Sequence, residues 1–330
     1  MRSRGGLGRA AIGIAISTVA LFLVARSVDI GATWNAMRSA QPSWLLLLSG
    51  FIVLDLLLRA LRWRILLSPV GDVRYRASLG ALLVGYLANN VLPARLGEVV
   101  RSHDMGERSG LSKSTILGTI VVERVVDTVV VVTIAAIAIF VLSVRGIVAS
   151  AVLVGLAVTA LLVVGIVVGL AAHRLPGADR LSGFVNRWPR VHGLLVRLRA
   201  GLAITRDLRV MAIALALTLG SWSCAVLGFA AAAQSVGIEP TMGQAALLAA
   251  GVNLATAVPA APGYVGTFEL AAVTIAGSVG IDREPALAFA VLVHAFSLLV
   301  TSVGGVVALL TGGRRRVRVQ APVAEPRGEP

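Results

Sequence analysis

The sequence is poor in charged residues and nearly devoid of cysteine. Asp, Glu, Lys and Arg make up 14% of its 330 residues, against about 25% in a typical soluble domain, which argues against a soluble fold. With a single cysteine, Cys224, no intrachain disulfide can form. The histidines show no metal-ligand spacing, so we expect no metal site and no cofactor. They are His103, His173, His192 and His294.

The short motifs of common enzyme classes are also missing from the sequence. It has no P-loop, no nucleophile elbow and no zinc-binding motif. The glycines Gly6 and Gly8 are not followed by the strand and helix that a dinucleotide-binding fingerprint requires. These absences favour a protein that is not an enzyme.

Long apolar runs are what the sequence does contain. Hydrophobic residues make up 57% of the chain, and the mean hydropathy is +0.88. Several runs exceed the length of about 18 residues that crosses a bilayer, which predicts an all-α, polytopic membrane protein. The formal net charge of +14 lies in short arginine clusters between these runs. That pattern is typical of cytoplasmic loops, so we expect a multi-pass protein of the cell membrane and no nucleic-acid partner.

The apolar runs predict six full spans, with both termini in the cytoplasm. Of the thirty Lys and Arg, Arg26, Arg38, Arg145 and Arg283 fall on the proposed outside, and Arg124 lies within a span. The arginine-rich segment at 173–209 is placed inside, as the positive-inside rule requires. A count by hydropathy alone would give seven or eight spans. The six spans are 8–28, 43–67, 114–143, 147–172, 210–236 and 285–311.

A first irregular segment lies where an ordinary span would carry apolar residues. Proline removes a backbone donor and glycine loosens the helix, so this stretch cannot be an unbroken rod. In a membrane, such backbone persists only when it is buried in protein or lines a wet cavity. We therefore expect a broken, re-entrant hairpin. Its polar and helix-breaking residues are Asn89, Asn90, Pro93, Arg95, Gly97, Glu98 and Arg101.

A second irregular segment, at 242–279, occupies the matching place later in the chain. It predicts a second re-entrant hairpin, and its notable residues are Asn253, Pro259, Pro262, Gly263, Gly266 and Glu269. Residues 8–143 and 147–311 then repeat one series of span, span, broken hairpin and span, with opposite orientation. Paired broken segments in inverted halves point to a substrate site near the bilayer midplane. Two unrelated irregular stretches are the alternative.

We thus expect one integral membrane domain over residues 1–311 and a basic, disordered cytoplasmic tail at 312–330. The tail contains Arg314, Arg315, Arg316 and Arg318, followed by three prolines. Composition of this kind does not favour a packed core.

The first hairpin carries candidate ligands for a lipid headgroup. Arg95 and Arg101 have the geometry that binds phosphate oxygens, and Asn89 and Asn90 could add amide contacts. Glu98 could neutralise an arginine, contact a cationic group or accept a proton. Because a charge inside a membrane costs at least about 2.5 kcal/mol, idle charges are disfavoured there. The alternative is an arginine and glutamate pair that caps the hairpin at the interface.

Three further sets of charges have structural interpretations. Glu269 opens a helical run, where a carboxylate is favoured by the helix dipole whatever its function. Glu123, Arg124 and Asp127 share one helix face, and we interpret them as an internally paired cluster that joins two helices. Arg59, Arg62 and Arg64 are interpreted as an orientation anchor at the membrane interface.

Four motifs in order resemble a known family. They are Arg59-x-x-Arg62-Trp63, Asn90-x-x-Pro93-x-Arg95-x-Gly97-Glu98-x-x-Arg101, Val122-Glu123-Arg124-x-x-Asp127 and Pro262-Gly263-x-x-Gly266-x-x-Glu269. Across residues 8–311 the chain resembles the lysylphosphatidylglycerol synthase transmembrane region, also called the flippase-like or UPF0104 family. The resemblance implies functional roles for Asn90, Arg95, Glu98, Arg101, Glu123, Arg124, Asp127 and Glu269.

What the resemblance implies is movement of a lipid headgroup between leaflets, without the aminoacyl transfer that a separate domain performs in some members. The implied partners are membrane lipids, whether anionic, aminoacylated or polyprenyl-linked, and a separate lipid-modifying enzyme. Two other hypotheses stay open. One is a membrane transferase acting on lipid-linked substrates, and the other is a non-transporting accessory subunit.

Overall fold

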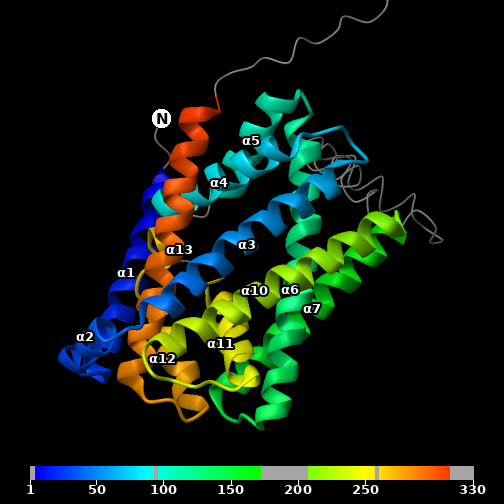
Figure 1. The fold of residues 1–330 in the computed structure, drawn as a ribbon. Coiled ribbons are helices and arrows are strands. Elements are labelled where there is room, and N and C mark those ends of the chain that lie inside the picture. The colour runs from blue at the N-terminus through cyan, green and yellow to red at the C-terminus, as the bar shows by residue number, and fades with distance from the viewer. Residues whose placement is uncertain (1–3, 93–95, 172–206, 257–259, 313–330) are drawn as a thin grey trace, which may run out of the picture.

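The computed structural model describes residues 4–92, 96–171, 207–256 and 260–312, and every regular element within these ranges is helical (Figure 1). Four helices are long and apolar enough to cross a membrane: α3 (Pro42–Leu67), α6 (Lys113–Leu142), α10 (Leu208–Ser235) and α13 (Arg283–Thr311). The prediction of a helical membrane protein is therefore confirmed. The predicted link at 173–209 and tail at 312–330 lie almost wholly outside the described residues.

The predicted first and fourth spans are also helical, as α1 (Arg4–Ser27) and α7 (Ile147–Ala171). The segment between the first two predicted spans forms a short helix, α2 (Ile30–Arg38), at 88° to α1. The Asp29 carboxylate starts this helix by accepting hydrogen bonds from the Gly31 and Ala32 amides at 2.7 and 3.1 Å. Counted as one bent span, α1 and α2 bring the candidate spans to five.

The longest interface in the fold joins α3 to α10, which run antiparallel along each other (Figure 1). At one end the Gln41 amide donates to the Ser235 carbonyl at 2.9 Å, and at the other the Arg62 guanidinium donates to the Thr218 hydroxyl at 2.9 Å. Between them Gly228 lies against Leu48 and Phe51. Small residues of this kind let membrane helices approach closely.

The first irregular segment folds as a helical hairpin. Its arms are α4 (Tyr75–Val91) and α5 (Gly97–Ser109), which pack against each other across the break. The backbones of the two arms are in close contact, since a β-carbon on Gly97 would overlap the Gly85 carbonyl oxygen. The second arm ends at Gly110, whose φ of 73° is the left-handed conformation that glycine adopts at helix ends.

The second irregular segment folds in the same way. Helix α11 (Met242–Ala255) is followed by a single 3-10 turn, η4 (Pro262–Tyr264), and by α12 (Thr267–Ser278), which packs back on α11. Positive φ angles at Gly263 and Gly266, 70° and 89°, turn the chain between the arms. Away from the break, the Gln244 side chain donates to the Val279 carbonyl at 3.0 Å and ties the arms together.

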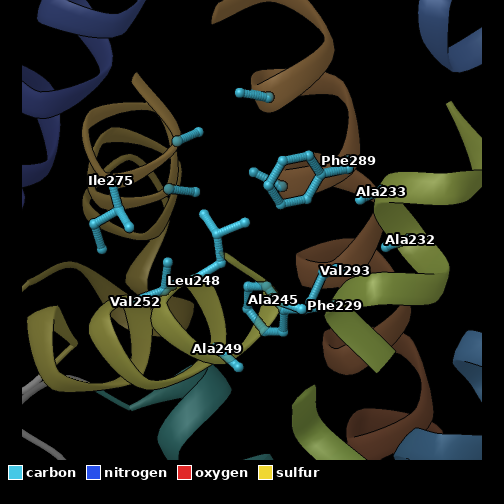
Figure 2. Packing of buried hydrophobic residues seen from close by; sticks show 14 of the residues in the cluster. Phe229, Ala232, Ala233, Ala245, Leu248, Ala249, Val252, Ile275, Phe289 and Val293 are labelled. Carbon is cyan, nitrogen blue, oxygen red and sulfur yellow. The ribbon is translucent and has the colours of Figure 1, made fainter. Parts of the chain in front are cut away.

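Each first arm packs along a long helix from elsewhere in the chain. Helix α4 runs along α13, where Gly304 and Gly305 lie against Leu83 and Leu87, and α11 runs along α6. The largest apolar core lies around α10, α11, α12 and α13 and includes Phe229, Leu248 and Phe289 (Figure 2). Conversely, large apolar side chains such as Phe140, Leu161 and Leu310 stay exposed on the outside. An exposed apolar surface of this kind fits contact with lipid.

The contact between Gly97 and Gly85 generates a prediction about stability. We expect Gly97→Ala to lower the free energy of unfolding by about 1–3 kcal/mol, because the added methyl group forces the hairpin arms apart. Gly50→Ala is the matched control, since nothing lies within 4 Å of a β-carbon there. The control should be neutral or stabilising by up to about 1 kcal/mol. Thermal unfolding of the purified protein in detergent measures both, and equal midpoints would contradict the close approach.

Candidate functional site

In the first broken segment, the end of α4 lies against α13. Here we call the last turn of α4, which carries Asn89 and Asn90, the first tip. The Asn90 side-chain amide donates to the Thr301 and Ser302 hydroxyls of α13 at 2.9 and 3.0 Å. The Asn89 side-chain oxygen accepts a hydrogen bond from the Gly97 amide at 2.7 Å. One asparagine therefore closes the break, and the other fixes it to α13.

The second broken segment ends on the same helix. We call η4 and the first turn of α12 the second tip. His294 of α13 contacts it with both ring nitrogens, Nδ1 at 2.6 Å from Oε1 of Glu269 and Nε2 at 2.6 Å from the carbonyl oxygen of Gly263. The other oxygen of Glu269 accepts from the Gly266 amide at 2.6 Å. Both Glu269 and His294 are buried.

The two tips therefore meet, although they are about half the chain apart in sequence. A β-carbon on Gly263 would lie 3.7 Å from the Asn90 carbonyl oxygen and 3.5 Å from the Leu298 side chain. His294, Leu298 and Thr301 are spaced by four and three residues, which places them on one face of α13. This face of α13 is the common support of both tips.

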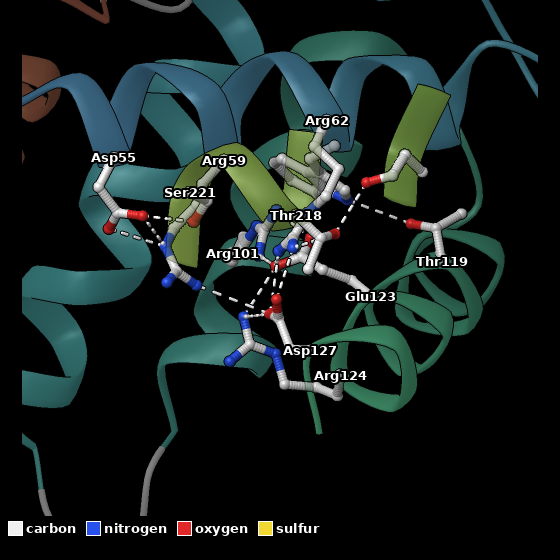
Figure 3. Close-up of polar contacts among 12 residues, drawn as sticks. Asp55, Arg59, Arg62, Arg101, Thr119, Glu123, Arg124, Asp127, Thr218 and Ser221 are labelled. Carbon is white, nitrogen blue, oxygen red and sulfur yellow. Dashed lines mark hydrogen bonds and ion pairs between the residues drawn. The ribbon is translucent and has the colours of Figure 1, made fainter. Parts of the chain in front are cut away.

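A buried charged cluster lies beside the first hairpin (Figure 3). Arg101 of α5 donates twice to the Glu123 carboxylate of α6, at 3.0 and 2.8 Å, and its guanidinium stacks 3.6 Å above the Trp63 ring. Arg62 of α3 makes a similar two-point contact with Asp127 of α6. Paired bonds between guanidinium and carboxylate are strong and directional, so they fix α3, α5 and α6 together.

The cluster continues to one exposed arginine. Asp55 and Arg59 pair along α3 at 2.8 Å, and Ser221 of α10 donates to Asp55. Arg124 donates to Glu123 at 2.8 Å, yet its side chain is 44% exposed. Among the described residues, the cluster thus contains four guanidinium groups and three carboxylates, with one positive charge in excess. It consists of Asp55, Arg59, Arg62, Arg101, Glu123, Arg124 and Asp127.

The structure separates the predicted site residues into different surroundings. Asn89, Asn90, Pro262, Gly263, Gly266 and Glu269 lie at the tips. Arg101 belongs to the charged cluster, and Glu98 is half-buried in the first turn of α5. Asn253 bonds back to the Ala249 carbonyl of its own helix. Pro93, Arg95 and Pro259 lie outside the described residues.

Two features of the site were missed from the sequence. His294 was set aside because it has no metal-ligand spacing, although a histidine within a long apolar run was itself a signal. Arg62 was interpreted as an orientation anchor at the interface. That interpretation is wrong for Arg62, because its side chain is fully buried between Glu123 and Asp127.

Because Glu123 pairs with three arginines, its charge is predicted to be essential for folding. Glu123→Gln keeps the shape but leaves buried guanidinium groups uncompensated, so we expect a loss of about 3–5 kcal/mol of stability. Glu107→Gln is the control, because Glu107 is 64% exposed and its pair with Lys113 should contribute at most about 1 kcal/mol. Yield of folded protein and thermal unfolding measure the difference. Equal behaviour of the two variants would show that the cluster is dispensable.

Comparison with known proteins gives two relatives. The chain is 26% identical to Glycosyltransferase AglD of Haloferax volcanii over 91% of its own length and 54% of that protein. It is 33% identical to a UPF0104 membrane protein of Methanothermobacter thermautotrophicus over 36% of each chain. The chain therefore spans about half the length of the first relative and matches about a third of the second.

The family resemblance deduced from the four motifs is confirmed over most of the chain. Residues 10–305 match the family described as the lysylphosphatidylglycerol synthase TM region. That range includes both tips, the charged cluster, the long helices α3, α6 and α10, and α13 up to residue 305. The chain belongs to the lysylphosphatidylglycerol synthase transmembrane-region family.

Proposed function

We propose that this protein moves a lipid headgroup between the leaflets of the cytoplasmic membrane, at a site between its two tips. The observation that carries the proposal is the meeting of two broken helical hairpins on one face of α13. Broken helices that meet inside a membrane protein are where secondary transporters bind their substrates. A membrane family related to lipid synthesis fits this role.

The proposal includes two inverted halves, 8–143 and 147–311, in one membrane domain. Several interfaces support the inverted halves, because a helix of one half packs on the other half in the same way as its counterpart does. Helix α3 packs antiparallel to its counterpart α10, and α4 on α13 corresponds to α11 on α6. In each half, one pair of an acidic and a basic side chain joins the second arm of the hairpin to the next long helix. These pairs are Arg101 with Glu123 and Glu269 with His294. In this arrangement the hairpins enter from opposite faces of the membrane.

The charged cluster is proposed to receive the headgroup phosphate. Its excess positive charge is uncompensated among the described residues of the cluster, which favours binding of an anion such as phosphate. Arg124 is the most accessible of the four arginines, and its fork of N–H donors matches phosphate oxygens. Glu123 lies ten residues into α6, which corresponds to about 15 Å along the helix axis. That depth is about half of the hydrocarbon thickness of a bilayer.

Sidedness and partners follow from the same proposal. The arginine clusters support a cytoplasmic location of both termini, and in this proposal the lipid enters from the cytoplasmic leaflet past the first hairpin. Anionic, aminoacylated and polyprenyl-linked lipids all carry the phosphate that Arg124 would bind. A separate enzyme that modifies the lipid would supply the substrate.

A transferase function is the second candidate, because one relative is named a glycosyltransferase. Since the chain spans about half of that protein, the name alone does not assign the activity to this half. The two candidates differ in a simple measurement. A transporter exchanges intact labelled lipid between leaflets, whereas a transferase changes the chemical structure of the lipid.

Transport should depend on the contact of the first tip with α13. Thr301→Val removes the hydroxyl that accepts from Asn90, a bond of about 1 kcal/mol, and should change the rate of leaflet exchange about fivefold. Exchange of a labelled anionic phospholipid in proteoliposomes measures this rate. Thr133→Val is the matched control, because both hydroxyls bond to a carbonyl four residues earlier in their own helices.

The expected result is a changed rate for Thr301→Val and a rate equal to wild type for Thr133→Val. Equal rates for all three proteins would remove the tips from the transport mechanism. No exchange by the folded wild-type protein, with chemically altered lipid recovered, would favour the transferase.

A further inference from the structure

We propose that Glu269 and His294 together bind one exchangeable proton, and that this proton holds the second tip closed against α13. The imidazole ring makes two short contacts. Each ring nitrogen of His294 lies 2.6 Å from an oxygen atom, Nδ1 from the Glu269 carboxyl group and Nε2 from the Gly263 carbonyl. Distances this short require a hydrogen atom between the partners.

The chemistry of the acceptors fixes where the protons lie. A backbone carbonyl cannot donate, so Nε2 carries a proton and donates it to Gly263. Between Nδ1 and Glu269 one more proton is needed, on either the ring or the carboxyl group. The pair is therefore an imidazolium with a carboxylate, or a neutral imidazole with a carboxylic acid. Both forms have no net charge and contain the same number of protons.

Losing that proton breaks the closed arrangement. The unprotonated Nδ1 and the Glu269 carboxylate would then present lone pairs to each other at 2.6 Å, inside a buried site. An uncompensated negative charge would also be left in a low-dielectric interior, which is unfavourable. Separation of the two side chains relieves both effects. Because Nε2 also bonds to Gly263, movement of the ring frees the turn at the second tip.

Aromatic rings and uncharged helix segments pack around the pair of Glu269 and His294. Phe268 stacks on the His294 ring at 4.4 Å, and Phe229 lies 6.2 Å from Phe268. Helices α7 and α11 and residues 13–25 of α1, which pack near α12, carry no charged side chain. Among the described residues, the Glu269 carboxyl group accepts from the Gly266 amide and contacts the His294 ring.

Other ionisable groups lie on α13 itself, in η4 of the second tip and on the helices packed against α13. On α13, Arg283 and Glu284 lie in the first turn, ten or more residues from His294. Tyr264 lies in η4, one residue after Gly263. The other helices carry Arg38 of α2, Asp55, Arg59, Arg62 and Arg64 of α3, Tyr75, Arg76 and Tyr86 of α4, and Arg209 and Cys224 of α10.

The consequence is a dependence of tip opening on pH. Solvated Glu and His side chains, once separated, hold one proton fewer than the closed pair at any pH above about 6.5. A difference of one proton shifts the equilibrium between closed and open tips about tenfold per pH unit. Falling pH therefore favours the closed tip. The link of this shift to lipid movement rests on the proposed function, whereas the proton itself does not.

The proton is tested first without any transport measurement. Nuclear magnetic resonance of ¹⁵N-histidine-labelled protein in lipid nanodiscs, at about pH 7.5, should show one strongly hydrogen-bonded downfield proton on a histidine ring. We expect this signal to disappear in both His294→Gln and Glu269→Gln and to persist in His103→Gln, which replaces an exposed histidine. A His294 ring that titrates near pH 6.5, as a solvated histidine does, would overturn the proposal.

Transport then tests the consequence. Wild-type leaflet exchange should rise up to about tenfold per pH unit above about pH 6.5, and His103→Gln should keep this profile. His294→Gln and Glu269→Gln should have flat profiles, because neither pair can release the proton. A flat wild-type profile despite the downfield signal would overturn the coupling. If the wild type exchanges no lipid while the signal is present, the proposed function fails and the proton site stands.

Discussion

The backbone polar groups at a helix break must be satisfied, and in a membrane water cannot do so cheaply. Each helix end leaves several N–H or C=O groups without a partner, and lipid offers none. In this protein, side chains take that role at both tips. Asn89 accepts from the Gly97 amide, Glu269 from the Gly266 amide and Ser17 of α1 from the Ala261 amide, at 2.6 to 2.9 Å. Each of these contacts satisfies a backbone N–H group that the break would otherwise leave without a partner.

This constraint also explains why α13 has polar residues on one face of an apolar helix. His294 satisfies the Gly263 carbonyl, and Thr301 and Ser302 accept from Asn90. Hydrogen bonds of about 1 kcal/mol each are strong enough to favour the observed contacts and weak enough to exchange. The charged cluster differs in this respect. Its paired contacts among Arg62, Arg101, Glu123 and Asp127 are strong and buried, so it forms a rigid base for the first hairpin.

The sequence predicts the elements well and their contacts only in part. Apolar runs located the long helices, and Pro93, Gly97, Pro262 and Gly263 located both hairpins, because backbone chemistry alone dictates where a helix breaks. The sequence did not indicate the length of the second arm of the first hairpin, since α5 continues through charged residues to Ser109. The partners of Arg62 and Arg101 were not predictable, because Glu123 and Asp127 approach them only through packing of α3 and α5 on α6.

The central claim is that the two hairpins enter the membrane from opposite faces, and sidedness of their open ends tests it most directly. Ser112 follows the first hairpin and Glu239 precedes the second, and both are exposed. Single cysteines at these positions, in a background where the buried Cys224 is replaced by serine, can be labelled in intact cells with a membrane-impermeant maleimide. The account predicts labelling of the cysteine at position 239 and protection of the cysteine at position 112. Labelling of both, or of neither until the cells are opened, would contradict it.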